Sequence, residues 1–162
     1  MRFGILTLSD RSSRGERADS SGPALARLIE AEGWSITKQS LLPDDESAIR
    51  QILSEWSDSR DLDVILTTGG TGFSPRDVTP EATRAVIDRE APGLAEAMRA
   101  ASLKITPHAM LSRIVTGIRK QTLIINLPGS PKGAVENLQV VIPVLLHAVQ
   151  LLQEDPRSES SH

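Results

Sequence analysis

The sequence predicts a three-layer α/β fold, an αβα sandwich whose mostly parallel sheet carries an antiparallel edge strand. Short, nearly continuous apolar runs, typical of buried parallel strands, alternate with helical segments along the chain. Such alternation favours an α/β domain with helices on both faces of the sheet. Two apolar runs at residues 114–118 and 122–127 are joined by a tight basic turn, which predicts the antiparallel pair at one edge.

Local sequence signals set the boundaries of the elements. Asp45 suits the N-cap of one helix, Thr79 followed by Pro80 suits the start of another, and Gly33 suits a C-cap. Ahead of the edge pair, the expected elements are a strand at 3–8, a polar loop to about residue 21, a helix at 22–33, a strand at 34–42, an amphipathic helix containing Ile49, Ile52, Leu53 and Trp56, a strand at 64–66, and helices at 80–89 and 94–104. A last helix continues to about Gln153, with Pro143 kinking or restarting it.

Length and composition narrow the class of protein. With 162 residues we expect one domain over residues 1–153 and a polar tail over 154–162. A net charge of -3 and an aromatic content of 2% argue against nucleic acid as a partner. The chain has no cysteine, which excludes disulfides and thiolate chemistry. We find neither a signal-peptide pattern nor a run of membrane-spanning length, so we expect a cytoplasmic protein without membrane contact.

A glycine- and threonine-rich loop after the strand at 64–66 is the strongest functional signal. Its members are Thr68, Gly69, Gly70, Thr71 and Gly72. Glycines let the backbone adopt positive φ and approach a ligand closely, and the amides of such turns can surround an anion. Neither a Walker A loop nor a G-x-G-x-x-G dinucleotide loop fits, because no lysine-serine or lysine-threonine pair follows and Pro75 takes the third glycine position. We interpret the loop as binding phosphate or an oxyanion, although a tight strand-to-helix connection is the alternative.

Polar segments directly follow four predicted strands. They are Ser9-Asp10-Arg11, Pro43-Asp44-Asp45, the glycine loop continuing to Asp77, and Pro128-Gly129-Ser130-Pro131-Lys132. Because ligands of open α/β sheets bind beyond the carboxyl ends of the strands, we expect these segments to form one cleft.

Asp44 and Asp77 are the best catalytic candidates in this cleft. Asp45 accounts for the helix cap, which leaves Asp44 without an obvious structural task, although capping alone could explain both. Two carboxylates on neighbouring loops could hold Mg²⁺ together with a substrate phosphate. Arg11 and Arg76 are expected to contact phosphate, with a solvated surface charge as the alternative for each.

Five ordered motifs together carry a family resemblance. They are S-D-R at 9–11, L-P-D-D at 42–45, T-T-G-G-T-G-F-S-P-R-D-V-T-P-E-A-T at 67–83, M-L-S-R at 110–113 and L-I-I-N-L-P-G-S-P-K-G at 123–133. Over about residues 2–153 the chain resembles the molybdenum-cofactor biosynthesis proteins of the MogA type and the G domains of gephyrin-like proteins.

The resemblance implies a molybdopterin adenylyltransferase, which uses ATP, molybdopterin and Mg²⁺ to make adenylylated molybdopterin and pyrophosphate. Asp44 and Asp77 match the two essential aspartates of the family. The residues expected to bind substrate are Ser9, Asp10, Arg11, Thr68, Gly69, Gly70, Thr71, Gly72, Arg76, Ser112, Asn126, Pro128, Gly129, Ser130 and Lys132. The resemblance also implies a homotrimer and a transient contact with the molybdate-inserting protein.

Two other functions stay open at this point. A MoaB-type relative would bind the pterin without catalysing adenylyl transfer. A nucleotide pyrophosphatase of the competence-damage-related type would release pyrophosphate from ATP without any pterin.

Overall fold

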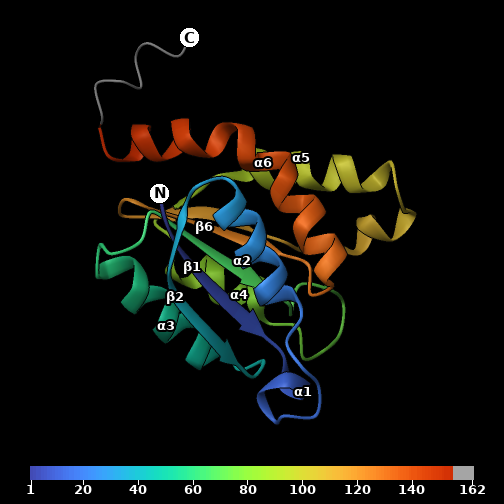
Figure 1. Ribbon diagram of the computed structural model, residues 1–162. Coiled ribbons are helices and arrows are strands. Elements are labelled where there is room, and N and C mark those ends of the chain that lie inside the picture. Colours follow the sequence, from blue (N-terminus) through green and yellow to red (C-terminus); the bar gives the residue numbers. More distant parts are fainter. Residues whose placement is uncertain (155–162) are drawn as a thin grey trace.

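The computed structural model describes residues 1–154, so the tail expected at 154–162 lies outside the described residues except for Glu154. Within these described residues, one six-stranded sheet has the strand order β2-β1-β3-β6-β5-β4 and is covered by helices (Figure 1). In chain order the elements are β1 (Arg2–Leu8), α1 (Asp10–Ser13), α2 (Ser21–Ala31), β2 (Ser35–Leu42), α3 (Glu46–Asp58), β3 (Val64–Thr68), α4 (Thr79–Val86), β4 (Arg89–Glu90), α5 (Pro92–Leu103), the 3₁₀ helix η1 (Pro107–Leu111), β5 (Thr116–Arg119), β6 (Thr122–Leu127) and α6 (Pro131–Leu152).

The sheet confirms the predicted α/β class. Strands β2, β1, β3 and β6 are parallel neighbours, and β5 pairs antiparallel with β6. The edge, however, is β4, a strand that we did not predict, which pairs antiparallel with β5 where we expected a helix to end at about Arg89. Helix α4 ends at Val86 because Ile87 turns to extended backbone, with ψ 146°. The chain then runs along β5, and the amide of Asp88 donates to the carbonyl of Ile118 at 2.8 Å.

Successive side chains of β1 enter two separate cores, which makes the fold three-layered. Phe3 and Ile5 pack with α2, α5 and α6 on one face, whereas Leu6 and Leu8 pack with α3 and α4 on the other. In Figure 1, α5 and α6 lie on the opposite side of the sheet from α3. The alternation follows from the two-residue period of a strand.

Helix α6 runs to Leu152, close to the expected end at about Gln153, and it is apolar along its length. By length and composition alone it could cross a membrane, which corrects the expectation that no run reaches that length. Core helices pass the same test, and α6 packs against α2, α5 and β6 through Leu138, Val141 and Leu145. Pro143 lies inside this 22-residue helix without ending it.

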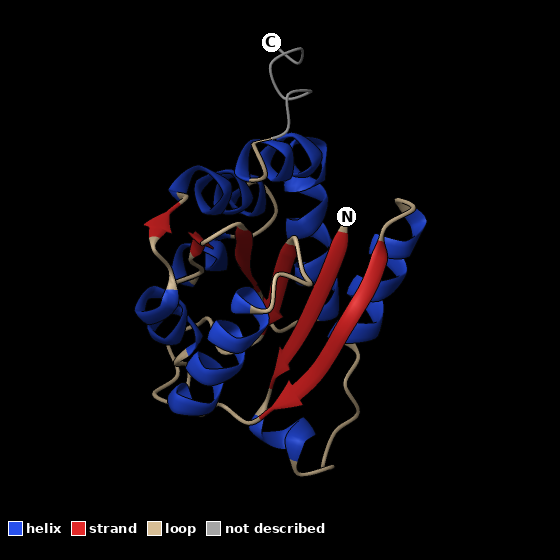
Figure 2. Cartoon of the chain, turned by 90° about the vertical axis from the view of Figure 1, so that its left-hand side faces the viewer, coloured by secondary structure: helices blue, strands red, loops and turns tan. Residues whose placement is uncertain are grey.

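The carboxyl ends of the parallel strands meet at one edge of the sheet. Figure 2 shows β1 and β2 running side by side in the same direction, with α1 just beyond their ends. The amide of Ser9 donates to the carbonyl of Leu42 at 3.0 Å, and that of Gly69 donates to the carbonyl of Leu127 at 3.2 Å. The polar segments after β2, β1, β3 and β6 are therefore neighbours, as the sequence predicted.

Two short helices replace predicted irregular chain. Helix α1 lies within the loop expected after residue 8, and η1 follows α5 where we expected only a stop. Each begins with a side-chain cap, because Ser9 Oγ accepts from the amide of Ser12 and Thr106 Oγ1 accepts from the amide of His108. One or two turns are too short to give a recognisable hydrophobic period.

Candidate functional site

The glycine loop requires its first two glycines. Gly69 has φ 109°, and a Cβ there would lie 2.1 Å from the carbonyl oxygen of Leu8. Gly70 has φ 62°, and a Cβ there would lie 2.4 Å from Thr79 Oγ1. Thr79 does not cap α4 as we predicted, because it is the first helical residue and its hydroxyl donates to the carbonyl of Gly69 at 2.9 Å. The loop thus packs against β1 and α4 with no room for a side chain at Gly69 or Gly70.

Asp77 closes the second half of the loop with its own carboxylate. Asp77 Oδ2 accepts from the amide of Gly72 at 2.9 Å and from that of Ser74 at 3.1 Å. The amide of Asp77 donates to the carbonyl of Ser74 at 2.9 Å. Loop shape and carboxylate position are therefore coupled.

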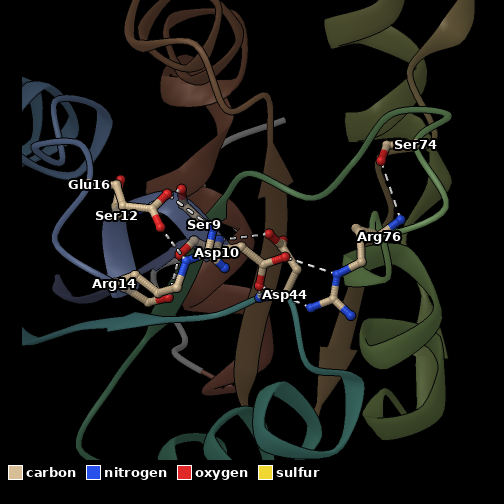
Figure 3. A network of polar contacts seen from close by, with 9 residues as sticks. Ser9, Asp10, Ser12, Arg14, Glu16, Asp44, Ser74 and Arg76 are labelled. Carbon is tan, nitrogen blue, oxygen red and sulfur yellow. Dashed lines mark hydrogen bonds and ion pairs between the residues drawn. The ribbon is translucent and has the colours of Figure 1, made fainter.

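Asp10 and Asp44 bind each other's backbone. The amide of Asp10 donates to Asp44 Oδ2, and the amide of Asp44 donates to Asp10 Oδ1, both at 3.0 Å. Arg76 adds a two-pronged ion pair with Asp10, from Nε at 2.9 Å and Nη2 at 3.0 Å (Figure 3). This pair joins the glycine-loop side of the cleft to the β1 side, and it lowers the pKa of Asp10.

The Asp44 carboxylate is only partly hydrogen-bonded. Among residues 1–154 nothing hydrogen-bonds to its buried Oδ1, and a Cβ on Gly70 would lie 2.8 Å from that atom. Burial raises the pKa of Asp44, the backbone hydrogen bond from Asp10 opposes the rise, and the charges of Asp10 and Asp77 add to it. An ionised carboxylate only accepts hydrogen bonds, so a donor or a cation is what this oxygen lacks.

Two cavities flank the glycine loop, each of about 300 Å³. The Asp44 cavity is lined by Thr7, Leu8, Ser9, Ser12, Arg17, Ala18, Asp19, Ser20, Ser21, Asp44, Thr68, Gly69, Gly70, Gly129 and Ser130. The Ser112 cavity is lined by Thr71, Gly72, Arg99, Ser102, Ile105, Thr106, His108, Ala109, Leu111, Ser112, Pro128, Ser130, Gly133, Glu136 and Asn137. Ser112 Oγ is buried and has no hydrogen-bond partner in the part of the chain that the structure describes, and Ser130 lines both cavities.

The structure brings most of the expected site residues to these two cavities, but not all. Asp10 and Asp77 are hydrogen-bonded to the lining residues Asp44 and Gly72, and Arg76 is hydrogen-bonded to Asp10, but none of the three is itself in either lining. Arg11 is exposed and lines neither cavity. Lys132 also lies outside them, with its side chain 77% exposed and paired with Glu136 at 3.1 Å.

Asn126 lies beneath the site instead of on a cavity wall. It is fully buried, its Oδ1 accepts from the amide of Val115, and its Nδ2 donates to the hydroxyls of Thr67 and Thr83. The expectation that its side chain contacts substrate does not fit this placement, because all of these contacts lie within the core. Asn126 instead ties β6 to β3 and α4 under the glycine loop.

Sequence reasoning missed several residues of the cavity walls. Arg17 and Asp19 come from the loop between α1 and α2, and Arg99 and Asn137 come from α5 and α6. Asp19 accepts from the hydroxyl of Thr7 and from the amide of Gly22, which fixes the start of α2 against β1. The polar character of residues 9–21 could have indicated Arg17 and Asp19, whereas nothing in the sequence distinguishes Arg99 and Asn137 from other polar residues of helices.

Comparison with known proteins agrees with this geometry. Residues 4–147 match the family described as "Probable molybdopterin binding domain". The chain belongs to this family. Within the molybdopterin-binding family it is 46% identical over 146 residues to the molybdopterin adenylyltransferase of Escherichia coli strain K12, covering 87% of this chain and 73% of that protein. It is 47% identical over 165 residues to gephyrin of Dictyostelium discoideum, covering 96% of this chain.

A solved structure of the same family is also similar throughout. The molybdopterin biosynthesis enzyme MoaB from Thermus thermophilus is 52% identical and superposes with a TM-score of 0.90, covering 96% of this chain and 98% of that one. The chain spans only 23% of the length of the gephyrin. The predicted resemblance to MogA-type and gephyrin-like proteins is confirmed.

Proposed function

We propose that this chain is a molybdopterin adenylyltransferase, which transfers AMP from ATP to the terminal phosphate of molybdopterin and releases pyrophosphate. The observation that carries the proposal is the buried, unpartnered Oδ1 of Asp44 beside a glycine loop with a cavity on each side. The E. coli relative bears this activity in its name.

The two cavities suit two substrates that must meet at the loop. ATP phosphates fit the Asp44 cavity, because Arg17 and the Gly69–Gly70 backbone lie in its wall beside the carboxylate. The pterin fits the Ser112 cavity, whose wall contains apolar side chains and the unpartnered hydroxyl of Ser112. Ser130 lines both cavities, so the α-phosphate of ATP and the terminal phosphate of molybdopterin would meet beside it.

The donor set fits Mg²⁺. Among residues 1–154 no group of three or more histidine or acidic side chains could hold a metal alone. Mg²⁺ commonly takes one or two carboxylates and completes its shell with phosphate and water oxygens, which Asp44 and Asp77 would allow. When bound, Mg²⁺ would neutralise the phosphate charges as the two anions approach.

The chain's own residues would contribute positioning and charge. The anionic phosphates repel each other, so catalysis depends on alignment and on neutralisation and requires no nucleophilic side chain. Gly69 and Gly70 line the Asp44 cavity, so their backbone would lie beside the phosphates, and Ser130 lines both cavities. Arg76, held by Asp10 at the rim, would add positive charge.

A purified-protein assay tests this function. The chain is mixed with ATP, Mg²⁺ and molybdopterin, and adenylylated pterin and pyrophosphate are measured. Pyrophosphate release that needs both substrates supports the proposal. Pterin binding without turnover would instead assign the MoaB-type role, which the 52% identity to a protein named MoaB keeps as the second candidate. Pyrophosphate from ATP alone would assign a pyrophosphatase.

We also propose a cytoplasmic homotrimer that contacts the molybdate-inserting protein transiently. Helix α6 supports an oligomer, because its Val144, Leu146 and Leu151 are each about half exposed despite their size. Light scattering coupled to size exclusion would give about three times the 17.5 kDa chain mass for a trimer.

A further inference from the structure

Arg113 lies between η1 and β5 and binds the glycine loop and the helix that follows it. Its amide donates to the carbonyl of Thr71 at 2.9 Å, and its Nε donates to the carbonyl of Gly72 at 2.7 Å. Its Nη2 donates to the carbonyl of Asp77 at 2.6 Å, and its Nη1 pairs with Glu81 on α4. One residue thus joins the middle of the loop, at Thr71 and Gly72, to its end at Asp77 and to the helix that follows.

These contacts are placed where they control Asp77. The carboxylate of Asp77 accepts from the amide of Gly72, and Arg113 binds the carbonyls of the same two residues. Residues 73–76 between them are exposed, so little apolar packing fixes this turn. Polar contacts therefore set where the Asp77 carboxylate lies.

The guanidinium shape matters as much as its charge. Arg113 reaches acceptors in three directions through its three nitrogens. A lysine ammonium on a flexible stem carries the same charge but cannot span these acceptors. Arg113 lines neither the Asp44 cavity nor the Ser112 cavity. It acts through the loop and not on the substrate.

Arg113 also places the opposite wall of the site. Its backbone bond to Thr71 brings the preceding Ser112 against the loop, where the unpartnered Ser112 hydroxyl lines the second cavity. Movement of this segment would displace Asp77 and Ser112 together.

We propose that Arg113 is a positioning residue for adenylyl transfer, which fixes the Asp77 carboxylate and the Ser112 wall relative to Asp44. The proposal rests on the proposed function for its kinetic readout. It assigns the arginine of the M-L-S-R motif to the geometry of the reaction.

The kinetic test is Arg113→Lys under saturating Mg²⁺. We expect kcat to fall about 100-fold, the loss typical of a catalytic group displaced by about 1 Å, with the KM values for ATP and molybdopterin within about twofold of wild type. Arg119→Lys is the matched control, because Arg119 also bridges a carboxylate, Asp58, and a backbone carbonyl, Val86, away from the site. Arg119→Lys should lose about as much stability as Arg113→Lys and keep the wild-type kcat.

A second measurement is independent of activity. Amide hydrogen exchange of Gly72 and Ser74, the two donors to Asp77, should accelerate about tenfold or more in Arg113→Lys and stay at the wild-type rate in Arg119→Lys. If the wild type makes no adenylylated pterin, the proposed function fails, while exchange still decides whether Arg113 orders the loop.

Three results would overturn the role of Arg113. Unchanged exchange at Gly72 and Ser74 would show that the loop does not depend on it. Wild-type kcat in Arg113→Lys would show that loop order does not govern turnover. A raised KM for ATP with kcat preserved would instead indicate direct contact with substrate. Should Arg113→Lys not fold, Glu81→Gln is the substitute, because it removes only the charge of the side chain that pairs with Arg113 Nη1. Its kcat should lie between the wild-type value and zero, and amide exchange at Gly72 and Ser74 should be faster than in wild type.

Discussion

Replacing Asp44 with asparagine is expected to stabilise the free protein while removing its activity. Asp44 Oδ1 is buried without a donor, and burial together with the charges of Asp10 and Asp77 raises its pKa. Asparagine keeps an oxygen for the amide of Asp10 and replaces Oδ1 with a neutral amide group, so it removes the cost of burying the charge and its repulsion by Asp10 and Asp77. Leaving a buried polar group unpaired costs about 1–3 kcal/mol, more for a charge, and we take a gain of about 1 kcal/mol because the side chain is partly exposed to screening water. At this chain length, about 1 kcal/mol corresponds to a rise of about 2–4 °C in Tm.

The assay is thermal unfolding of wild type and Asp44→Asn at pH 7 without Mg²⁺ or nucleotide. Because the pKa of Asp44 is raised on folding, its penalty is fully present above the folded pKa and disappears as pH falls toward the ordinary value of 3.8. The advantage of asparagine should therefore shrink with acidification.

Asp63→Asn is the matched control, in which the change in Tm should have the opposite sign. Burial raises the pKa of Asp63, but hydrogen bonds from the side chain and amide of Arg2 outweigh it and lower the pKa overall. Removing that charge should lower Tm at pH 7. A Tm for Asp44→Asn equal to or below that of wild type would refute the inference that the charge of Asp44 destabilises the free protein.

Three further substitutions test the frame of the site and its surroundings. Gly69→Ala should cost about 3 kcal/mol in urea unfolding, because a methyl group would meet the Leu8 carbonyl at 2.1 Å with φ at 109°; a cost below about 1 kcal/mol would contradict the geometry. Asn126→Leu should cost about 3 kcal/mol in the same assay, since it leaves two hydroxyls and one amide in the core unpaired, and an unchanged midpoint would count against that network. Arg119 and Lys120 lower the pKa of Asp58 to about 2, so the stability that its charge contributes is lost as pH falls from 3.8 through that value. Asp58→Asn should therefore lose less stability than wild type over this pH range. An acid-unfolding curve identical to that of wild type would contradict this expectation.

The architecture of the sheet and the place of the site could be predicted because their signals are local. Asp45 does cap α3, with its Oδ1 accepting from the amide of Ala48 at 2.8 Å. The glycines after β3 lie where the strand order predicts a ligand, since four parallel strands end there.

Other parts of the site depend on contacts between distant residues, which no local pattern encodes. Arg113 meets Gly72 and Asp77 across sequence separations of 41 and 36 residues, and from the sequence it is only a charged residue. Thr79 resembles a helix cap, yet its hydroxyl donates to the carbonyl of Gly69 instead. Asn126 belongs to a ligand-lining motif by resemblance, but its neighbours Thr67 and Thr83 hold it in the core.

Adenylyl transfer by the wild type and by Asp44→Asn decides whether the buried Asp44 carboxylate serves the reaction. Each protein is incubated with ATP, Mg²⁺ and molybdopterin, and adenylylated molybdopterin and pyrophosphate are quantified together. We predict equal amounts of the two products from wild type and almost none from Asp44→Asn, although that variant melts at a higher temperature. Product formation at the wild-type rate by Asp44→Asn, or none from wild type, would contradict the proposed role of this residue.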